Sequence, residues 1–153
     1  MTNRNGAVGV RTLKDGDRER WLELWSAYLA FYRAEVPDEV TEVTFARLRD
    51  GVEGMLGLVA TAPGGEVIGF AHLVFHPSTW ASTGYCYLED LFVHPSARGG
   101  DVSRALFDAV FAEARARGSQ RTYWHTQQFN GAARSLYDTV GRLTSMVEYE
   151  RTL

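Results

Sequence analysis

One segment, from Val93 to Leu106, restricts the fold of this chain more than any other. It reads VHPSARGGDVSRAL: an apolar strand stops at a proline, an arginine and two glycines follow, and an apolar pattern with helical spacing begins at once. Glycines allow a ligand close to the backbone, and a helix start offers unpaired N–H donors with a partial positive charge. The segment predicts a strand, a turn and a helix with a phosphate or pyrophosphate site between them. Asp101 is the residue that opposes an anion there.

The rest of the chain alternates short strands and helices. Hydrophobic spacing predicts strands over 8–13, 56–61, 67–75, 85–93, 121–125 and 145–151, and helices between 15 and 37 and over 44–50, 102–118 and 130–140. An acidic loop is expected over 35–42, a turn at 63–65 and a looser stretch over 77–84. This order predicts an α+β or mixed α/β fold in which helices pack on one sheet.

Composition excludes several classes of protein. A length of 153 residues predicts one domain, and a formal net charge of -3 gives no support for a nucleic-acid or anionic-membrane partner. The stretch Met1–Gly6 is polar, without the apolar core of a signal peptide, and no apolar run is long enough to span a bilayer. Cys86 is the only cysteine, which predicts a cytoplasmic protein without disulfides. The four histidines lack the spacing of a metal site, so no metal is expected.

Three motifs carry a resemblance to a known family. Arg98, Asp101 and Ser103 occupy the positions of a pattern Arg/Gln-x-x-Gly-x-Gly/Ala, and Asn130, Ala133 and Tyr137 follow in the order Asn, Ala, Tyr on a helix. The run YLEDLFV over 87–93 is similar to spermidine/spermine acetyltransferases and related small-amine enzymes. Together these motifs resemble the GNAT superfamily of N-acetyltransferases. The resemblance implies one GNAT domain over 1–153, with a twisted, mostly antiparallel sheet of six to seven strands and about four helices.

The resemblance also implies where acetyl-CoA binds. Backbone groups of Leu91, Phe92 and Val93 would hold the pantetheine arm, and one N–H there would serve as oxyanion donor. The pyrophosphate loop would be formed by Arg98, Gly99, Gly100, Asp101, Val102, Ser103 and Arg104, with Asn130 and Ala133 as further cofactor contacts. Asn130 is equally suited to be a helix N-cap, and the two roles are compatible.

Two side chains are expected to carry the chemistry. A lysine-like amine is almost fully protonated at neutral pH, so a base must free its lone pair. Glu89 is the candidate base, and its alternatives are attraction of a cationic substrate or a structural salt bridge. Strand alternation predicts that Asp90 faces the opposite side from Glu89. Tyr137 is the candidate general acid for the leaving thiolate, or else a core residue, whereas Cys86 is expected to be buried rather than nucleophilic.

The acceptor site is less sharply marked. Its candidates are acidic and aromatic side chains of four segments, namely Tyr28, Glu35, Trp80, Asp90 and His125. Carboxylates attract a cationic amine, and aromatic rings line a pocket for a cation or a ring. The same acidic residues are equally explained as a solvated charge run, and most of the aromatic ones as core.

Asp101 divides the functional hypotheses. As an N-cap it would bond the N–H of Ser103 or Arg104, the donors that a pyrophosphate needs, and its charge would repel the ligand. Weakened acetyl-CoA binding is therefore expected. The first hypothesis is an acetyl-CoA-dependent N-acetyltransferase that acts on a small primary amine by direct attack. The alternatives are a non-catalytic acyl-CoA-binding or ligand-sensing module and a protein-lysine or N-terminal acetyltransferase; homodimers are common in the family.

Overall fold

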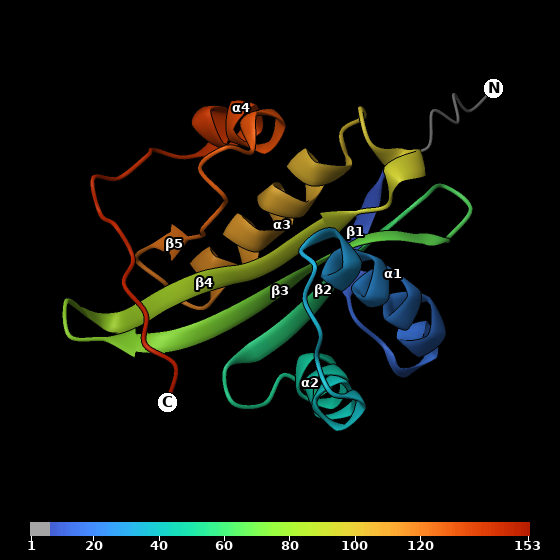
Figure 1. Ribbon diagram of the computed structural model, residues 1–153, viewed down its shortest axis with the longest axis horizontal. Coiled ribbons are helices and arrows are strands. Elements are labelled where there is room, and N and C mark those ends of the chain that lie inside the picture. The colour runs from blue at the N-terminus through green and yellow to red at the C-terminus, as the bar shows by residue number, and fades with distance from the viewer. Residues whose placement is uncertain (1–6) are drawn as a thin grey trace.

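The computed structural model describes residues 7–153, arranged around one five-stranded sheet (Figure 1). The strands are β1 (Gly9–Thr12), β2 (Met55–Thr61), β3 (Val67–Ser78), β4 (Ala81–Val93) and β5 (Thr122–Tyr123), and they lie side by side in this order. The first four pair antiparallel, and β5 pairs parallel to β4. The polar stretch Met1–Gly6, expected to carry no signal peptide, lies outside the described residues.

Helices cover both faces of the sheet. Helices α1 (Arg18–Phe31) and α2 (Asp38–Asp50) share one core cluster, which is centred on Trp21, Phe45 and Phe70. Helix α3 (Val102–Ala116) builds the other cluster with Leu106 and Phe107, and α4 (Gly131–Val140) packs against it through half-buried side chains. Each sheet face is thus sealed by apolar contacts, and the predicted α+β class is confirmed.

The sheet has fewer strands than the six to seven expected. The segment 145–151, expected to be a strand, pairs with no neighbour in the described chain, and residues 141–153 are exposed throughout. A strand needs an edge to pair with, and the nearest edge, β5, is only two residues long. The predicted strand over 121–125 shortens because Trp124 packs instead on Phe107, with ring centroids 5.0 Å apart.

Two further expectations fail at the ends of elements. The acidic loop over 35–42 is wrong beyond Pro37, because α2 begins at Asp38 rather than at residue 44. Asp38 and Glu39 fall in its first turn, where negative charge complements the helix dipole. The looser stretch over 77–84 is also wrong: β3 and β4 continue as a hairpin through Ser78 and Ala81. The register shift between His76 and Ser78 accommodates the proline between them.

Candidate functional site

The site begins where β4 and β5 separate. These strands pair only at Cys86–Thr122 and Tyr87–Tyr123, so the second half of β4 has no neighbour on that side within the described chain. The N–H of His94 donates to Ile68 O at 2.8 Å. Alternation from that bond turns the backbone of Phe92 toward β3 and the backbone of Leu91 and Val93 toward the open edge. Two of the three residues expected to hold a pantetheine arm thus turn backbone groups toward the open edge, where the carbonyl of Val93 accepts a hydrogen bond from Arg98.

A β-bulge in β4 reorients its acidic residues. His72 is opposite Asp90 and Leu73 is opposite Leu88, which leaves Glu89 as the extra residue. Leu88 and Leu91 both pack into the α3 cluster, whereas the Asp90 carboxylate reaches the hydroxyl of Tyr28 on α1. The prediction that Asp90 and Glu89 face opposite sides is therefore wrong, because strict alternation does not survive the inserted residue.

The two carboxylates differ in their surroundings. Glu89 is exposed, yet the partial loss of water around its carboxylate, and secondarily the neighbouring Asp90 charge, raises its pKa above the ordinary value. Asp90 accepts hydrogen bonds from Tyr28 Oη at 2.7 Å and from His72 Nδ1 at 2.9 Å. Glu89 thus has a carboxylate suited to take up a proton, whereas Asp90 is held in place by its neighbours.

Tyr137 lies on the inner side of α4. Its ring makes edge contacts with Phe107 and Trp124, with centroids 5.7 and 5.8 Å apart. Burial raises the pKa of its phenol, and the proximity of Tyr32 at the end of α1 contributes in the same direction. The phenol therefore stays protonated at neutral pH, as a general acid must be. Packing and proton donation are both compatible with this position.

The turn before α3 has the expected backbone but not the expected cap. Gly99 has a φ of +84°, a conformation that favours glycine, and no atom lies within 4 Å of the position that a Cβ would occupy. Asp101 is the N-cap residue, yet its side chain accepts no hydrogen bond from the first turn. The expected bond from Ser103 or Arg104 to Asp101 is therefore wrong. Asp101 acts on an anion through its charge, not by occupying these donors.

The two arginines near this turn make contacts of their own. Arg98 Nε donates to Val93 O at 3.0 Å, and its guanidinium carbon lies 5.4 Å from the centre of the Phe92 ring. Arg104 Nη2 donates to Thr139 Oγ1 on α4 at 3.0 Å. Each guanidinium has five N–H donors, so both keep donors for a phosphate. At the start of α4, Asn130 Oδ1 accepts from Ala133 N at 3.3 Å, which confirms Asn130 as an N-cap.

These features can be tested against a CoA thioester. The backbone of Leu91 and the N–H of Val93, at the open edge, fit an amide-bearing arm that continues the sheet, and the glycine turn with the start of α3 fits a pyrophosphate. The exposed carboxylate of Asp101 is unfavourable to the pyrophosphate. The geometry therefore fits the group, with one repulsive charge at its anionic end.

The structure brings together only part of the expected acceptor residues. Tyr28 reaches Asp90, and Glu35 lies exposed in the loop between α1 and α2. Trp80 is 86% exposed at the tip of the β3–β4 hairpin, roughly 30 Å along the chain from Glu89 at the usual rise of a strand. His125 Nδ1 lies 3.1 Å from Tyr87 Oη, and its Nε2 lies 3.4 Å from Glu148. Within one chain, Trp80 therefore does not belong to the group around Asp90.

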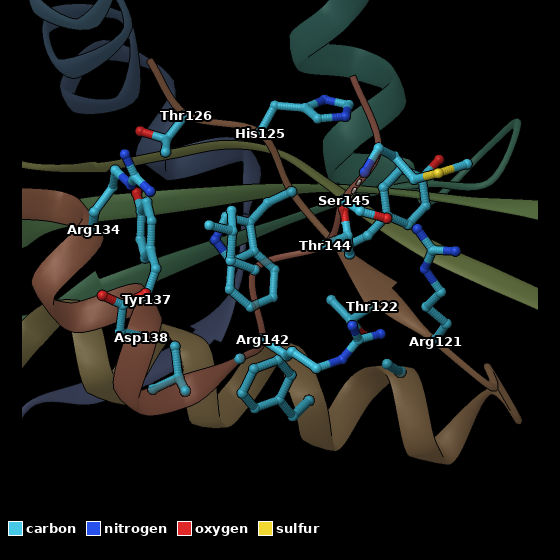
Figure 2. A pocket seen from close by; sticks show the side chains of 18 of the residues that line it. Arg121, Thr122, His125, Thr126, Arg134, Tyr137, Asp138, Arg142, Thr144 and Ser145 are labelled. Atoms are coloured by element: carbon cyan, nitrogen blue, oxygen red, sulfur yellow. Dashed lines mark hydrogen bonds between the residues drawn. The ribbon is translucent and has the colours of Figure 1, made fainter. Parts of the chain in front are cut away.

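A cavity of about 1020 Å³ lies at the outer edge of β5, not beside the bulge. β5, α4 and the C-terminal segment 141–148 enclose it, and Figure 2 shows Tyr137 and Thr126 at one end and Arg121 and Ser145 at the other. Of the expected site residues, Tyr137 and His125 line this cavity.

Sequence reasoning missed the residues that surround Asp90. His72, which is buried in β3, forms hydrogen bonds with both Asp90 and Trp21 of α1. Burial, and secondarily the charge of Asp90, raises the pKa of Tyr32. A polar histidine inside the apolar run of β3 was the available signal, since such a buried group requires partners.

Cys86 is fully buried as expected, and burial raises the pKa of its thiol to about 11. Among residues 7–153, no cluster of His, Cys, Asp and Glu is arranged to hold a metal, and no helix is long and apolar enough to cross a bilayer.

Known proteins resemble this chain over nearly its whole length. The family described as acetyltransferase (GNAT) family matches residues 21–141. The D-amino-acid N-acetyltransferase HPA3 of Saccharomyces cerevisiae is 34% identical over 148 residues, which cover 96% of this chain and 92% of that protein. The aminoglycoside N(6')-acetyltransferase type 1 of Klebsiella aerogenes is 31% identical, with 86% of this chain and 87% of that protein covered.

Solved structures share the fold at lower sequence identity. The aminoglycoside acetyltransferase AAC(6')-Iy, in complex with the bisubstrate analogue CoA-S-monomethyl-acetylneamine, superimposes with a TM-score of 0.82 at 20% identity. The superposition covers 97% of this chain and 99% of that one.

Proposed function

The chain belongs to the acetyltransferase (GNAT) family, and from this premise we propose that it acetylates the primary amine of a small molecule by direct attack on acetyl-CoA. Acetyl-CoA-dependent N-acetyl transfer is its general activity. The proposal concerns the acceptor and the residues that act on it. Two relatives are named for small amines, D-amino acids and aminoglycosides, and both names support an acceptor of this class.

One observation carries the proposal: the bulge places Glu89 and Asp90 on one face of β4, next to its open edge. A cationic ammonium group near two carboxylates is attracted, and Glu89, whose pKa is raised, takes its proton directly or through water. The neutral amine then attacks the thioester, and the N–H of Leu91 or Val93 donates to the developing oxyanion. Tyr137 protonates the leaving thiolate, and its phenolate takes back a proton from the acetylated nitrogen, directly or through water.

The test is release of free thiol from acetyl-CoA in the presence of a panel of amines. We expect Glu89→Gln to lower kcat by roughly 100-fold or more and to remove the acid limb of the pH profile. Glu66→Gln is the matched control, because Glu66 is an exposed carboxylate that pairs with Arg20 on the surface. If Glu89→Gln raises KM but leaves kcat unchanged, Glu89 only attracts the cation. No turnover above hydrolysis with any amine would favour the acyl-CoA-binding module that Asp101 suggests.

We further propose that two copies of the chain associate through the C-terminal segment 141–153. This segment exposes large apolar side chains, namely Leu143, Met146, Val147, Tyr149 and Leu153. It borders the cavity at the free edge of β5, so a two-fold exchange between copies would cover both the segment and the cavity in one self-complementary interface. Light scattering should give a dimer for the whole chain and a monomer for a variant with Met146 and Val147 changed to Asp. A monomeric whole chain would overturn this proposal.

Two broader expectations stay part of the proposed function. The chain would act as one acetyltransferase domain, since both core clusters share the same sheet. It would act in the cytoplasm, where its single cysteine stays reduced. Limited proteolysis and fractionation of the source cells test these two points.

A further inference from the structure

Four side chains form a continuous hydrogen-bonded row behind the bulge. Trp21 Nε1 donates to His72 Nε2 at 3.0 Å, His72 Nδ1 lies 2.9 Å from one oxygen of Asp90, and Tyr28 Oη donates to the other at 2.7 Å. Trp21 and His72 are only 1% and 2% exposed. The row therefore runs from the core on α1, through β3, to the acidic face of β4.

The donors in this row fix the state of His72. An indole N–H can only donate, so His72 Nε2 must accept, and the ring proton must sit on Nδ1, where it is donated to Asp90. A second proton on Nε2 would point at the N–H of Trp21 inside the core. Phe70 stacks on the other side of the imidazole, with centroids 4.3 Å apart, and keeps the ring in this plane. The hydrogen bond from Trp21 thus opposes a second proton on His72.

A neutral His72 determines the charge at Asp90. Each oxygen of Asp90 accepts one bond from a group without charge, so the carboxylate is oriented but not neutralised. The charged and titratable groups that face His72 are Asp90 and Glu89 of β4 and Tyr28 of α1, while β2 contributes Gly57 opposite it. The two carboxylates supply negative charge, Tyr28 is a neutral donor, and none of these groups is a cation. A mostly buried anion of this kind is costly unless a cation arrives from outside.

We propose that Trp21 and His72 are positioning residues for the acceptor: they hold Asp90 as a fixed, unneutralised carboxylate that pairs with the ammonium group of the incoming amine. This inference rests on the proposed function. It assigns Glu89 and Asp90 different tasks on the same face, proton removal for the first and binding of the cation for the second.

Trp21→Phe is the decisive variant, because it removes the N–H that keeps His72 neutral. In the variant, His72 is expected to gain a proton as the pH falls from about 8 to about 5. The imidazolium then neutralises Asp90, so kcat/KM for a cationic amine falls about tenfold per pH unit on the acid side, through KM rather than kcat. Trp25→Phe is the matched control: it makes the same change one turn along α1, and its lost hydrogen bond goes to Thr41.

Two readouts separate this inference from the proposed function. Nitrogen-15 NMR of the whole chain should show His72 with its proton on Nδ1 and untitrated in wild type and Trp25→Phe, but titrating in Trp21→Phe. Replacing His72 by Asn in the Trp21→Phe background should remove the new pH dependence. A wild-type His72 that titrates or carries its proton on Nε2, or a Trp21→Phe profile equal to that of Trp25→Phe, overturns the inference. No turnover with any amine overturns the proposed function instead, and the NMR result then decides whether His72 is held neutral.

Discussion

Replacing Asp101 tests the charge balance of the α3 turn. Asp101 is exposed, and its carboxylate makes no bond to the first turn of α3, so its effect on a bound pyrophosphate is electrostatic. Two unit charges about 4 Å apart interact by about 4 kcal/mol at an effective dielectric of about 20, and by about 1 kcal/mol in water. Because solvent surrounds Asp101, we take the lower value, which corresponds to about a fivefold change in the dissociation constant of acetyl-CoA.

Two substitutions separate charge from shape. Asp101→Asn keeps the volume of the side chain, and Asp101→Gly removes it; both should lower the dissociation constant about fivefold, because no capping bond is lost in either. Either substitution also removes a negative charge that stabilises the start of α3. The free energy of unfolding should therefore fall by a few tenths of a kcal/mol up to about 1 kcal/mol. Higher affinity should therefore accompany lower stability.

The assay is calorimetric titration with acetyl-CoA at low and high salt. At about 1 M salt the screening length falls to about 3 Å, and the three proteins should bind alike. Asp108→Asn is the control, since it removes the same charge from α3 about 10 Å further along the helix. Equal affinities at low salt, or an equal gain in Asp108→Asn, would refute the repulsion argument.

Three further substitutions test the candidate general acid, the apolar core and one ion pair. Tyr137→Phe should lower kcat by roughly 100-fold with little change in the dissociation constant of acetyl-CoA, measured by steady-state kinetics and titration. Phe107→Ala should destabilise the protein by about 3–5 kcal/mol in urea unfolding, because Phe107 is fully buried between α3 and α4. Arg11, chiefly by hydrogen bonding, lowers the pKa of Asp17. Asp17→Asn should therefore be less stable than wild type at neutral pH, and the difference should vanish as the pH falls below about 4 and Asp17 protonates.

The sequence predicted the elements whose signals are local. Helix α3 begins at Val102 as expected, because the glycines, the charge pattern and the apolar spacing all lie within fifteen residues of one another. Helix α4 has its N-cap at Asn130 for the same reason. The segment 145–151 failed because a strand is defined by its neighbour, and alternation alone does not supply an edge to pair with.

The bulge at Glu89 shows which part of the site depends on strand pairing rather than on local sequence. In the run LEDL two acidic residues lie between two leucines, which departs from strict alternation, and the pairing of Leu88 with Leu73 and of Asp90 with His72 identifies Glu89 as the extra residue. That pairing reverses the relation of the two carboxylates, from opposite faces to one face. The sequence therefore singled out both carboxylates but not their relative orientation.

The same distinction explains why the two halves of the site were not equally predictable. The donor half consists of backbone groups of one strand, one turn and one helix start, all within residues 91–104, and its chemistry follows from local conformation. The acceptor half joins Trp21 and Tyr28 of α1 to His72 of β3 and Asp90 of β4, and no two of these elements are adjacent in sequence except the hairpin strands. In our proposal its specificity depends on which nitrogen of His72 carries the proton, and the packed row determines this position. The proposal therefore predicts that core substitutions at Trp21 or His72 change acceptor selectivity and leave every local motif of the donor half intact.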